Sequence, residues 1–217
     1  MMEKSACGGI VVCGGKSSRM GVSKAMLPFG PERMLQRVVR VLSQEVDPIV
    51  VVAAAGQELP DLPLEVQVVR DRREGAGPLE GIAVGLAALQ DRAEAAYVSG
   101  CDVPLLSPDF VRRVIDFARG HDVAVPKTDG YHHPLAAVYR MTVLRRAERL
   151  LAENRMRPVF LYESVDARIL GAEELSPVDP GLQSLRNVNR PEDYLAALSE
   201  CGHVAEAEIL AQLKNAE

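Results

Sequence analysis

Short runs of apolar, mostly β-branched residues alternate along the chain with segments whose apolar residues recur at helical spacing. A continuous apolar run is typical of a strand buried on both faces, and recurrence every three to four residues is typical of a helix with one buried face. The expected strands are Gly9–Cys13, Ile49–Ala53, Val66–Val69, Ala95–Ser99 and Val123–Val125. The apolar stripes of the expected helices begin at Leu35, Leu79 and Phe110. Ser107 followed by Pro108 is a typical start for the third of these helices.

Strands that alternate with helices pair in parallel through right-handed crossovers, with the helices covering the sheet. The pattern therefore predicts the α/β class: an open, doubly wound, mostly parallel sheet of Rossmann-like type, in three layers. Such sheets bind ligands in the crevice outside the carboxyl ends of their strands. We therefore expect functional residues directly after Cys13, Ala53, Val69 and Ser99.

The pattern is weaker in the last third of the chain. It predicts a strand over Leu135–Tyr139 and a helix over Val143–Leu151. Arg186–Asn189 leads into a last helix with Pro191 near its start, and the mixed tail from His203 predicts a surface helix. The sequence contains no internal repeat and no low-complexity segment.

Composition narrows the classes of function. The 217 residues suit one large domain, and an apolar share of 47% is enough for a substantial core. A formal net charge of -5 argues against a general nucleic-acid binder. The four cysteines, Cys7, Cys13, Cys101 and Cys201, have neither C-x-x-C nor zinc-site spacing, so we expect reduced thiols. No segment has the pattern of a signal peptide or membrane span, so a cytoplasmic protein is expected.

The loop after the first expected strand carries the clearest chemistry. It reads GGKSSRMG from Gly14 to Gly21, and Lys24 follows shortly after it. Glycines let backbone N–H groups approach a phosphate, and Arg19 and Lys24 add positive charge beside them. Adjacent glycines do not fit the G-x-G-x-x-G pattern, and a Walker A loop would need its first glycine at Ile10, inside the strand. The loop therefore predicts a polyphosphate site; the alternative is a glycine turn with solvated basic residues.

Four segments together resemble the molybdenum cofactor guanylyltransferases, which belong to the nucleotide-diphospho-sugar transferase superfamily. They are VCGGKSSRMGVSKAMLPF from Val12, GPLEGI from Gly77, CDVPLL from Cys101 and NVNRPED from Asn187. The resemblance runs from about Gly8 to Leu198, and although the first segment is shared across the superfamily, the four in this order are specific. Cys13 stands where the family usually has alanine, and Ala53 where some members carry asparagine. Both departures bear on recognition of the base.

The resemblance implies an enzyme of molybdenum cofactor biosynthesis. With Mg²⁺ as cofactor, it would transfer GMP from GTP to the phosphate of molybdopterin or molybdenum-molybdopterin, releasing pyrophosphate. Molybdenum-insertion and molybdoenzyme maturation proteins are the implied protein partners, with no nucleic acid and no membrane. The implied organisation is one nucleotidyltransferase domain over residues 8–199, with a nucleotide-binding part at 8–125 and an acceptor-binding part at 126–199. A C-terminal helical tail would cover residues 200–217.

Asp102 is the predicted metal ligand, since a carboxylate at the carboxyl end of a strand lies at the ligand crevice and suits Mg²⁺. The alternative is an aspartate that only stabilises a turn. Arg19 and Lys24 would complete the catalytic set by stabilising the triphosphate and the developing pyrophosphate; for each, a solvated loop charge is the alternative. By resemblance, the nucleotide-binding residues are Val12, Cys13, Gly14, Gly15, Lys24, Ala53, Asp71, Gly77, Pro78, Leu79 and Asp102.

Three acidic or amide residues have implied roles with open alternatives. Asp71 would accept hydrogen bonds from the guanine N1–H and N2–H groups, unless it is a surface aspartate among the neighbouring arginines. Asn187 and Asn189 are implied metal or substrate contacts. Asn189 and Glu192 also have the spacing of a helix N-cap and its N3 acid, so a capping role for Asn189 stays open.

Two further segments have competing interpretations. Gly77–Gly81 leads into a helix whose N-terminal N–H groups could support an anion, and it is equally suited to a plain turn. His132 and His133 are adjacent, so their side chains diverge and we assign them no metal. The acceptor phosphate is already an anion, and the reaction therefore needs no Ser/His/Asp set.

Two other functions remain possible on the sequence. One is a related nucleotidylyltransferase with another base or acceptor, of cytidylyl or sugar-phosphate type; the segment GPLEG favours guanine over cytosine. The other is a non-catalytic carrier of the molybdenum cofactor, against which Asp102, Lys24 and Arg19 argue.

Overall fold

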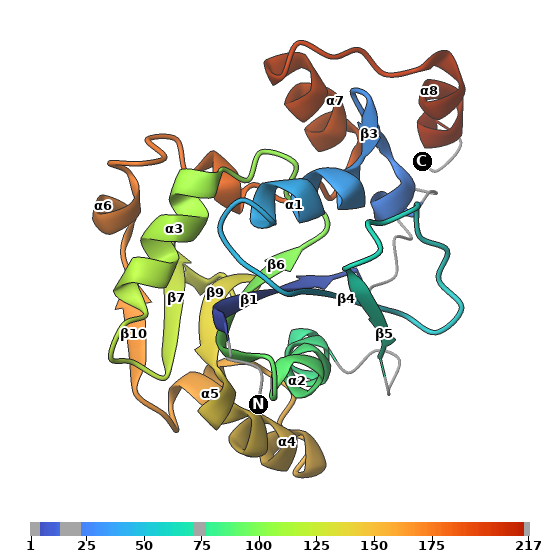
Figure 1. Cartoon of the computed structure of the whole chain (residues 1–217). Helices are drawn as coiled ribbons and strands as arrows, with labels where there is room; N and C mark the ends of the chain where they lie inside the picture. The colour runs from blue at the N-terminus through green and yellow to red at the C-terminus, as the bar shows by residue number, and fades with distance from the viewer. Residues whose placement is uncertain (1–4, 14–22, 72–76, 215–217) are drawn as a thin grey trace.

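The computed structural model describes residues 5–13, 23–71 and 77–214, and within them one large sheet runs through the molecule (Figure 1). Its strand order is β10-β7-β9-β6-β1-β4-β5, and β8 pairs with β7. The strands are β1 (Ser5–Val12), β4 (Ile49–Ala53), β5 (Gln67–Arg70), β6 (Ala93–Gly100), β7 (Val123–Thr128), β8 (Tyr131–His132), β9 (Ala136–Arg140) and β10 (Ala167–Leu170). The pairs β1–β4, β1–β6, β4–β5 and β10–β7 are parallel. Within this described sheet, the antiparallel pairs are β6–β9, β7–β9 and β7–β8.

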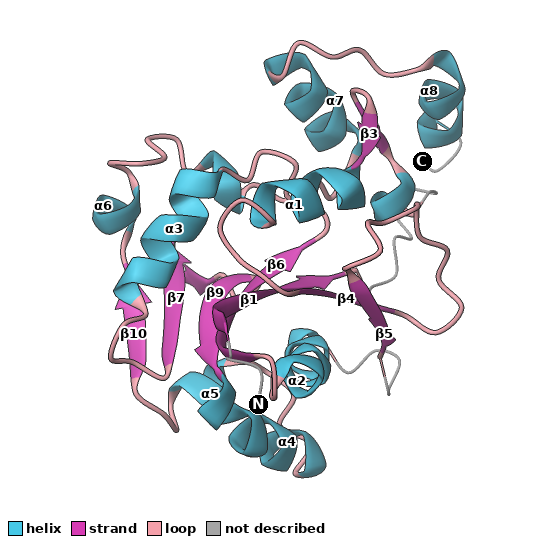
Figure 2. Ribbon diagram, viewed as in Figure 1, coloured by secondary structure: helices cyan, strands magenta, loops and turns pink. Residues whose placement is uncertain are grey.

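Helices cover both faces of the sheet, which gives three layers (Figure 2). The face that carries α1 and α3 is uppermost in Figures 1 and 2, and the opposite face carries α2, α4 and α5. The bounds are α1 (Met34–Leu42), α2 (Pro78–Leu89), α3 (Pro108–Phe117), α4 (Leu144–Ala152), α5 (Val159–Tyr162), α6 (Ala172–Leu175), α7 (Pro191–Glu200) and α8 (Ala207–Lys214). The prediction of an open, doubly wound, mostly parallel α/β sheet is confirmed.

Each central strand contributes to two separate cores. In β1, Val11 packs with α1 and α3, whereas Ile10 and Val12 pack with α2 on the opposite face. Successive side chains point to opposite faces of a sheet. Because both faces are covered, the centres of these strands are almost entirely apolar, which explains the continuous apolar runs of the sequence.

The start of α3 is as the sequence predicts. Ser107 is the N-cap, and its side-chain oxygen accepts a 3.2 Å hydrogen bond from the backbone N–H of Phe110, while Pro108 is the first helical residue. This helix follows the loop after β6, so its cap helps to fix the strand end at which Asp102 lies.

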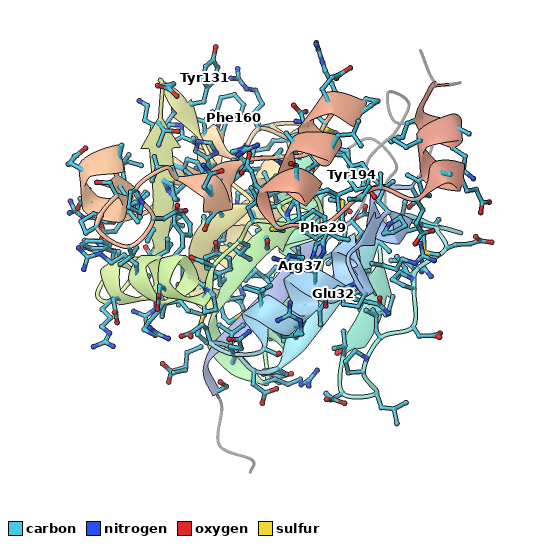
Figure 3. All side chains as sticks on the ribbon, turned by 90° about the horizontal axis from the view of Figure 1, so that it is seen from above. Phe29, Glu32, Arg37, Tyr131, Phe160 and Tyr194 are labelled. Carbon is cyan, nitrogen blue, oxygen red and sulfur yellow. The ribbon has the colours of Figure 1, made fainter. Side chains whose placement is uncertain are left out.

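A third apolar cluster lies beyond the sheet and joins residues 27–34 to the C-terminal helices. The short strands β2 (Pro28–Phe29) and β3 (Glu32–Arg33) form a hairpin that packs against α7 and α8. Figure 3 looks down on this part of the molecule, with Phe29 of the hairpin beside Tyr194 of α7. The Tyr194 hydroxyl donates to the carbonyl of Pro28 at 2.5 Å.

The predicted surface helix of the tail is present as α8 (Ala207–Lys214), and one of its faces packs against the rest of the chain. Ile209 and Leu213 of α8 are buried in this third cluster. Both side chains lie on one face of the helix, so burial of that face stabilises the docked tail. No described helix is both long and apolar enough to cross a membrane.

Candidate active site

Residues from strands far apart in sequence meet at the carboxyl edge of the sheet. Cys13 follows β1, Asp71 follows β5 and Asp102 lies just beyond β6. Backbone hydrogen bonds continue the strand pairing to this edge: Cys13 N–H to Val52 O at 2.8 Å, and Asp71 N–H to Ala53 O at 2.9 Å. These predicted site residues therefore lie along one edge, as the crevice rule requires.

Asp102 is the centre of a polar network built from three distant segments. Lys24 donates from Nζ to Asp102 Oδ2 at 2.9 Å, and Asn187 donates from Nδ2 to Asp102 Oδ1 at 3.0 Å. Lys24 Nζ also donates to Asn189 Oδ1 at 2.7 Å. The side chains of Lys24 and Asp102 are only 17% and 16% exposed, so solvent screens their ion pair little. The backbone carbonyl of Asp102 accepts a hydrogen bond from Val188 N–H at 2.8 Å. This bond joins the chain just beyond β6 to the segment that carries Asn187 and Asn189.

The ammonium of Lys24 lies where two side-chain oxygens converge. One oxygen belongs to the Asp102 carboxylate and the other to the Asn189 amide. In this arrangement the protein already holds one cation between hard oxygen donors. Among the described residues, no group of three or more His, Cys, Asp or Glu side chains could hold a metal, so a metal here would need further ligands from substrate.

The capping interpretation of Asn189 is wrong by one residue. The N-cap of α7 is Arg190, and the N3 acid is Asp193, whose Oδ2 accepts from the N–H groups of Asn189 and Arg190 at 3.0 and 2.9 Å. Asp193 thus satisfies the helix end. The Asn189 side chain is left to contact Lys24.

Asp71 carries a carboxylate oxygen, Oδ1, that is buried and without a hydrogen-bond partner among the described residues. Burial, followed by the nearby Glu80, raises the pKa of Asp71 above its ordinary value. Arg70 does not neutralise Asp71, because its guanidinium donates to the carbonyls of Ala54 and Gln57 at 3.0 and 2.9 Å. A buried carboxylate that lacks a donor is suited to a ligand edge that carries N–H groups.

Cys13 and Cys101 are neighbours at the ends of β1 and β6, where Val12 pairs with Gly100. Both side chains are buried, and neither forms a disulfide. The adjoining Cys101 thiol and burial raise the pKa of Cys13 well above its ordinary value, so it is a neutral thiol. Both thiols belong to the apolar core between the sheet and helices α1 and α3.

Sequence reasoning missed Gln57, which joins two of the strand ends. Its side-chain amide donates to the carbonyl of Cys13 at 3.3 Å and accepts from the N–H of Ala54 at 3.0 Å. A single polar residue in a long loop has no periodicity to mark it, so only the folded chain shows this role.

The start of α2 lies against β1 because its glycines leave room. A Cβ on Gly81 would come within 2.9 Å of Val12 Cγ1, and one on Gly85 within 2.5 Å of Ile10 Cγ2. Gly77 has a φ of 74°, a conformation that favours glycine, and Pro78 begins the helix. No described side chain caps this helix end. The segment therefore serves both as helix entry and as close packing beside the site.

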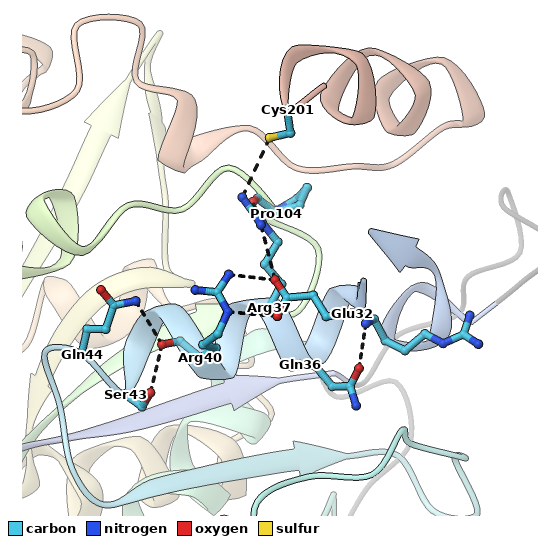
Figure 4. A network of polar contacts seen from close by, with 9 residues as sticks. Glu32, Gln36, Arg37, Arg40, Ser43, Gln44, Pro104 and Cys201 are labelled. Atoms are coloured by element: carbon cyan, nitrogen blue, oxygen red, sulfur yellow. Dashed lines mark hydrogen bonds and ion pairs between the residues drawn. The ribbon is translucent and has the colours of Figure 1, made fainter. Parts of the chain in front are cut away.

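An arginine of α1 braces the loop that carries Asp102 (Figure 4). Arg37 Nε donates to the carbonyl of Pro104 at 2.5 Å, and Arg37 Nη1 lies 3.4 Å from Glu32 Oε1. Arg40 donates to both oxygens of Glu32, which lowers the pKa of that carboxyl. The network fixes Pro104, two residues after Asp102, against α1 and the hairpin.

Three predicted site residues, Gly14, Gly15 and Arg19, lie outside the described residues. Their roles stay predictions. Val12, Lys24, Ala53, Asp71, Pro78 and Asp102 are all described, and each occurs at or beside the carboxyl edge of the sheet.

Comparison with known protein families gives a match over most of the chain. The family model described as "MobA-like NTP transferase domain" matches residues 9–167. A protein of Mycobacterium avium named "Probable molybdenum cofactor guanylyltransferase" is 38% identical over 201 residues, covering 90% of this chain and 97% of that protein. One of the same name from Pelotomaculum thermopropionicum is 34% identical over 190 residues, covering 87% and 90%.

Solved structures share the fold. Molybdopterin-guanine dinucleotide biosynthesis protein A from Archaeoglobus fulgidus superposes with a TM-score of 0.73 at 22% identity, over 89% of this chain and 98% of that one. The manganese complex of Rv0371C from Mycobacterium tuberculosis superposes with a TM-score of 0.56 at 23% identity, over 78% and 89%. At these identities the similarity concerns the fold.

Proposed function

The chain belongs to the MobA-like NTP transferase family, and we propose that it transfers GMP from GTP to the phosphate of molybdopterin or molybdenum-molybdopterin. The reaction releases pyrophosphate and forms the molybdopterin guanine dinucleotide cofactor. Two relatives at 38% and 34% identity, each matched over nearly their whole length, carry the name molybdenum cofactor guanylyltransferase and support this substrate pair. The observation that carries the proposal is the network of Lys24, Asp102, Asn187 and Asn189.

The donor set of this network fits Mg²⁺. Magnesium prefers oxygen ligands and keeps several positions for water and substrate phosphates. Asp102 Oδ2 and Asn189 Oδ1 already converge on one cation, the ammonium of Lys24. When bound, the metal would neutralise charge on the triphosphate and the attacking phosphate. The manganese complex of Rv0371C supports the use of a divalent cation in this fold.

The residues of the chain position the two phosphates rather than supply a nucleophile. Lys24 releases Asp102 when nucleotide binds and turns its ammonium to the triphosphate. The acceptor phosphate attacks the α-phosphorus in line, and pyrophosphate leaves, with Arg19 expected to neutralise its developing charge. Asn187 keeps the Asp102 carboxylate oriented through its 3.0 Å hydrogen bond. Catalysis is then positioning plus neutralisation of charge.

Asp71 recognises the base of the nucleotide by hydrogen bonding. Guanine presents N1–H and N2–H side by side, and the unpartnered Asp71 Oδ1 is an acceptor for such donors. These donors would favour the charged carboxylate and counteract the burial that raises its pKa. Adenine and cytosine each present a ring acceptor where guanine has N1–H, so Asp71 favours guanine.

The test compares nucleotide binding with transfer. In the presence of Mg²⁺, GTP should raise the melting temperature more than ATP, CTP or UTP does, since a ligand of the folded state stabilises it by mass action. Asp102→Asn should lower the transfer rate by about 100-fold or more at unchanged fold, as removal of transition-state charge stabilisation does. Selective stabilisation by CTP would identify a cytidylyltransferase, and molybdopterin binding without pyrophosphate release a carrier.

Three broader assignments belong to the same proposal. We place the reaction in the cytoplasm, supported by the adjacent unbonded thiols of Cys13 and Cys101, which suit a reducing compartment. Molybdenum-insertion and molybdoenzyme maturation proteins are its expected partners. A single domain over residues 8–199 remains our proposed organisation.

A further inference from the structure

A cavity of about 620 Å³ lies between α1, the start of β4 and the loop that joins β4 to β5. On α1 it is lined by Gln36, Val39, Arg40 and Ser43, whose spacing places them on one face of the helix. Figure 4 shows Gln36, Arg40 and Ser43 following one another along α1. None of the described residues that line the cavity is a predicted catalytic or nucleotide-binding residue, so the cavity is not part of the candidate active site.

The apolar part of the lining belongs to the core of the molecule. Val46 and Ile49 are almost fully buried in the core between the sheet and α1, and Val66 packs against that core. Gln36 Nε2 donates to the carbonyl of Asp61 at 2.9 Å, and this bond joins α1 to the loop on the other side of the cavity. The cavity is therefore preformed, and a ligand need not order these elements when it binds.

Three exposed carboxylates line the same cavity. The side chains of Asp47, Asp61 and Glu65 form no hydrogen bond or ion pair within the described part of the chain. Arg40 also lines the cavity, but its guanidinium already donates to both oxygens of Glu32. The cavity thus combines apolar walls with uncompensated negative charge. A ligand that carries both apolar and cationic groups is complementary to this lining.

An exposed leucine lies at the edge of the cavity. Val66 N–H donates to Pro63 O at 3.0 Å, so Leu64 and Glu65 are the central residues of a hydrogen-bonded turn. Leu64 is 102% exposed, whereas Pro63 and Glu65 on either side of it line the cavity. A small molecule inside the cavity would leave Leu64 in water. A protein segment that enters the cavity can also cover Leu64, which favours a protein as the occupant.

The charge of this surface disfavours a second copy of the chain as that protein. In a symmetric dimer the same patch of each subunit meets its counterpart. Asp47, Asp61 and Glu65 of one copy would then face the same carboxylates of the other, and the whole chain carries a formal net charge of -5. Like charges that meet across an interface oppose binding. The occupant that fits is therefore a different protein with a basic surface.

We propose that this cavity, together with Leu64, is a docking site for a basic amphipathic segment of a partner protein. Apolar side chains of the segment enter the cavity and cover Leu64, and flanking lysine or arginine side chains pair with Asp47, Asp61 and Glu65. A helix with an apolar stripe between basic flanks has this chemistry. The inference goes beyond the transfer reaction, because it assigns a surface to a protein partner whichever base and acceptor the enzyme uses.

The test uses a defined peptide as the probe and the full chain as the receptor. The probe is a fluorescein-labelled helical peptide of leucine, alanine and arginine, with leucine along one face and arginine on both flanks. Its binding is measured by fluorescence anisotropy at physiological salt, beside a peptide in which glutamate replaces arginine. Leu64→Asn removes the exposed apolar side chain and keeps a residue that suits a turn. The double variant Asp61→Lys, Glu65→Lys reverses two of the charges.

Each variant has a matched control away from the cavity. Tyr131→Asn removes another strongly exposed apolar side chain, on β8, which pairs with β7 across β6 from β4. The double variant Glu148→Lys, Glu153→Lys makes the same change of net charge at exposed residues on or just after α4, on the opposite face of the sheet from α1. The rise in melting temperature caused by GTP is measured for every variant, and it should be unchanged because none of these residues belongs to the candidate active site.

We expect the original chain to bind the arginine peptide and not the glutamate peptide. Leu64→Asn should weaken binding of the arginine peptide by about ten-fold, because the peptide no longer covers a leucine. The double variant Asp61→Lys, Glu65→Lys should weaken it by about ten-fold, since two attractive pairs become repulsive. Both controls should change the dissociation constant by less than about two-fold.

Three results would overturn the inference. The first is an arginine peptide that does not bind, or that binds the cavity variants as well as their controls. The second is a loss of binding in the charge variant with no change in Leu64→Asn, which would indicate a small cationic ligand. The third is self-association of the original chain in sedimentation that Leu64→Asn abolishes, which would assign the surface to a second copy. In each case GMP transfer by the original chain would leave the proposed function standing.

Discussion

Replacement of Lys24 by methionine should change metal binding and catalysis in opposite directions. In the chain without nucleotide, the Lys24 ammonium lies 2.9 Å from Asp102 Oδ2 and 2.7 Å from Asn189 Oδ1. A divalent cation that takes this position must displace the ammonium. Methionine keeps the length of the side chain and removes its charge, so the same two oxygens become available.

The magnitude follows from the contacts that displacement breaks. A hydrogen bond to a charged group contributes about 1.5–3 kcal/mol net, and the Lys24–Asp102 pair is mostly shielded from solvent. Since 1.4 kcal/mol is a factor of ten, Lys24→Met should tighten binding of a divalent cation by about 10-fold to 100-fold. Transfer of GMP should fall by about 100-fold to 1000-fold, because the same ammonium neutralises the triphosphate in the transition state.

The assay uses Mn²⁺ as a spectroscopic substitute for Mg²⁺, titrated in the absence of nucleotide. Lys127→Met is the matched control, since it removes one lysine charge that lies near His132 and takes no part in the Asp102 network. It should alter Mn²⁺ affinity by less than about two-fold. Unchanged or weaker Mn²⁺ binding in Lys24→Met would refute the reasoning, because the ammonium would then not occupy the cation position.

Three further predictions concern the base, a helix cap and acidity. Asp71→Asn should reduce the preference for GTP over ATP by about 10-fold, measured as the ratio of kcat/KM values, and an unchanged ratio would exclude Asp71 from base recognition. Ser107→Ala should lower the free energy of unfolding in urea by about 1 kcal/mol, because α3 loses its N-cap; a loss as small as that of Ser43→Ala, an exposed serine, would contradict the capping role. Burial lowers the pKa of His133 in the folded chain, so its contribution to stability is complete above the unfolded value of about 6.5 and is lost as the pH falls through the lower folded value. Between pH 7 and pH 5, the free energy of unfolding in urea should therefore fall less for His133→Gln than for the original chain. An equal fall would contradict a lowered pKa of His133 in the folded chain.

The parts of the fold that the sequence predicts well are those in which local pattern and tertiary packing agree. The apolar runs of β1 and β4 are continuous because both faces are covered, and the cap at Ser107 depends only on neighbouring residues. The antiparallel insertion of β9 has no such local signal, because a strand reads the same in either direction. The docking of α8 depends on partners about 180 residues earlier in the chain, which periodicity alone does not identify.

The residues of the candidate site likewise divide into those that the sequence predicts and those that only the fold brings together. Asp102 and Lys24 stand out in sequence because their types and positions suit phosphate chemistry. Their hydrogen bonds to Asn187 and Asn189 span 85 and 165 residues, so only the fold brings them together. The capping interpretation of Asn189 was wrong because two acids follow it, and the backbone uses Asp193 rather than Glu192.

The most direct test of the account follows a labelled α-phosphate. The purified chain is incubated with Mg²⁺, molybdopterin and GTP labelled at the α-phosphorus, and both the labelled dinucleotide and pyrophosphate are quantified, with Asp102→Asn in parallel. The account predicts one pyrophosphate released for each labelled dinucleotide formed, and loss of both products in Asp102→Asn. Molybdopterin that binds but gains no label, or equal product from Asp102→Asn, would contradict it.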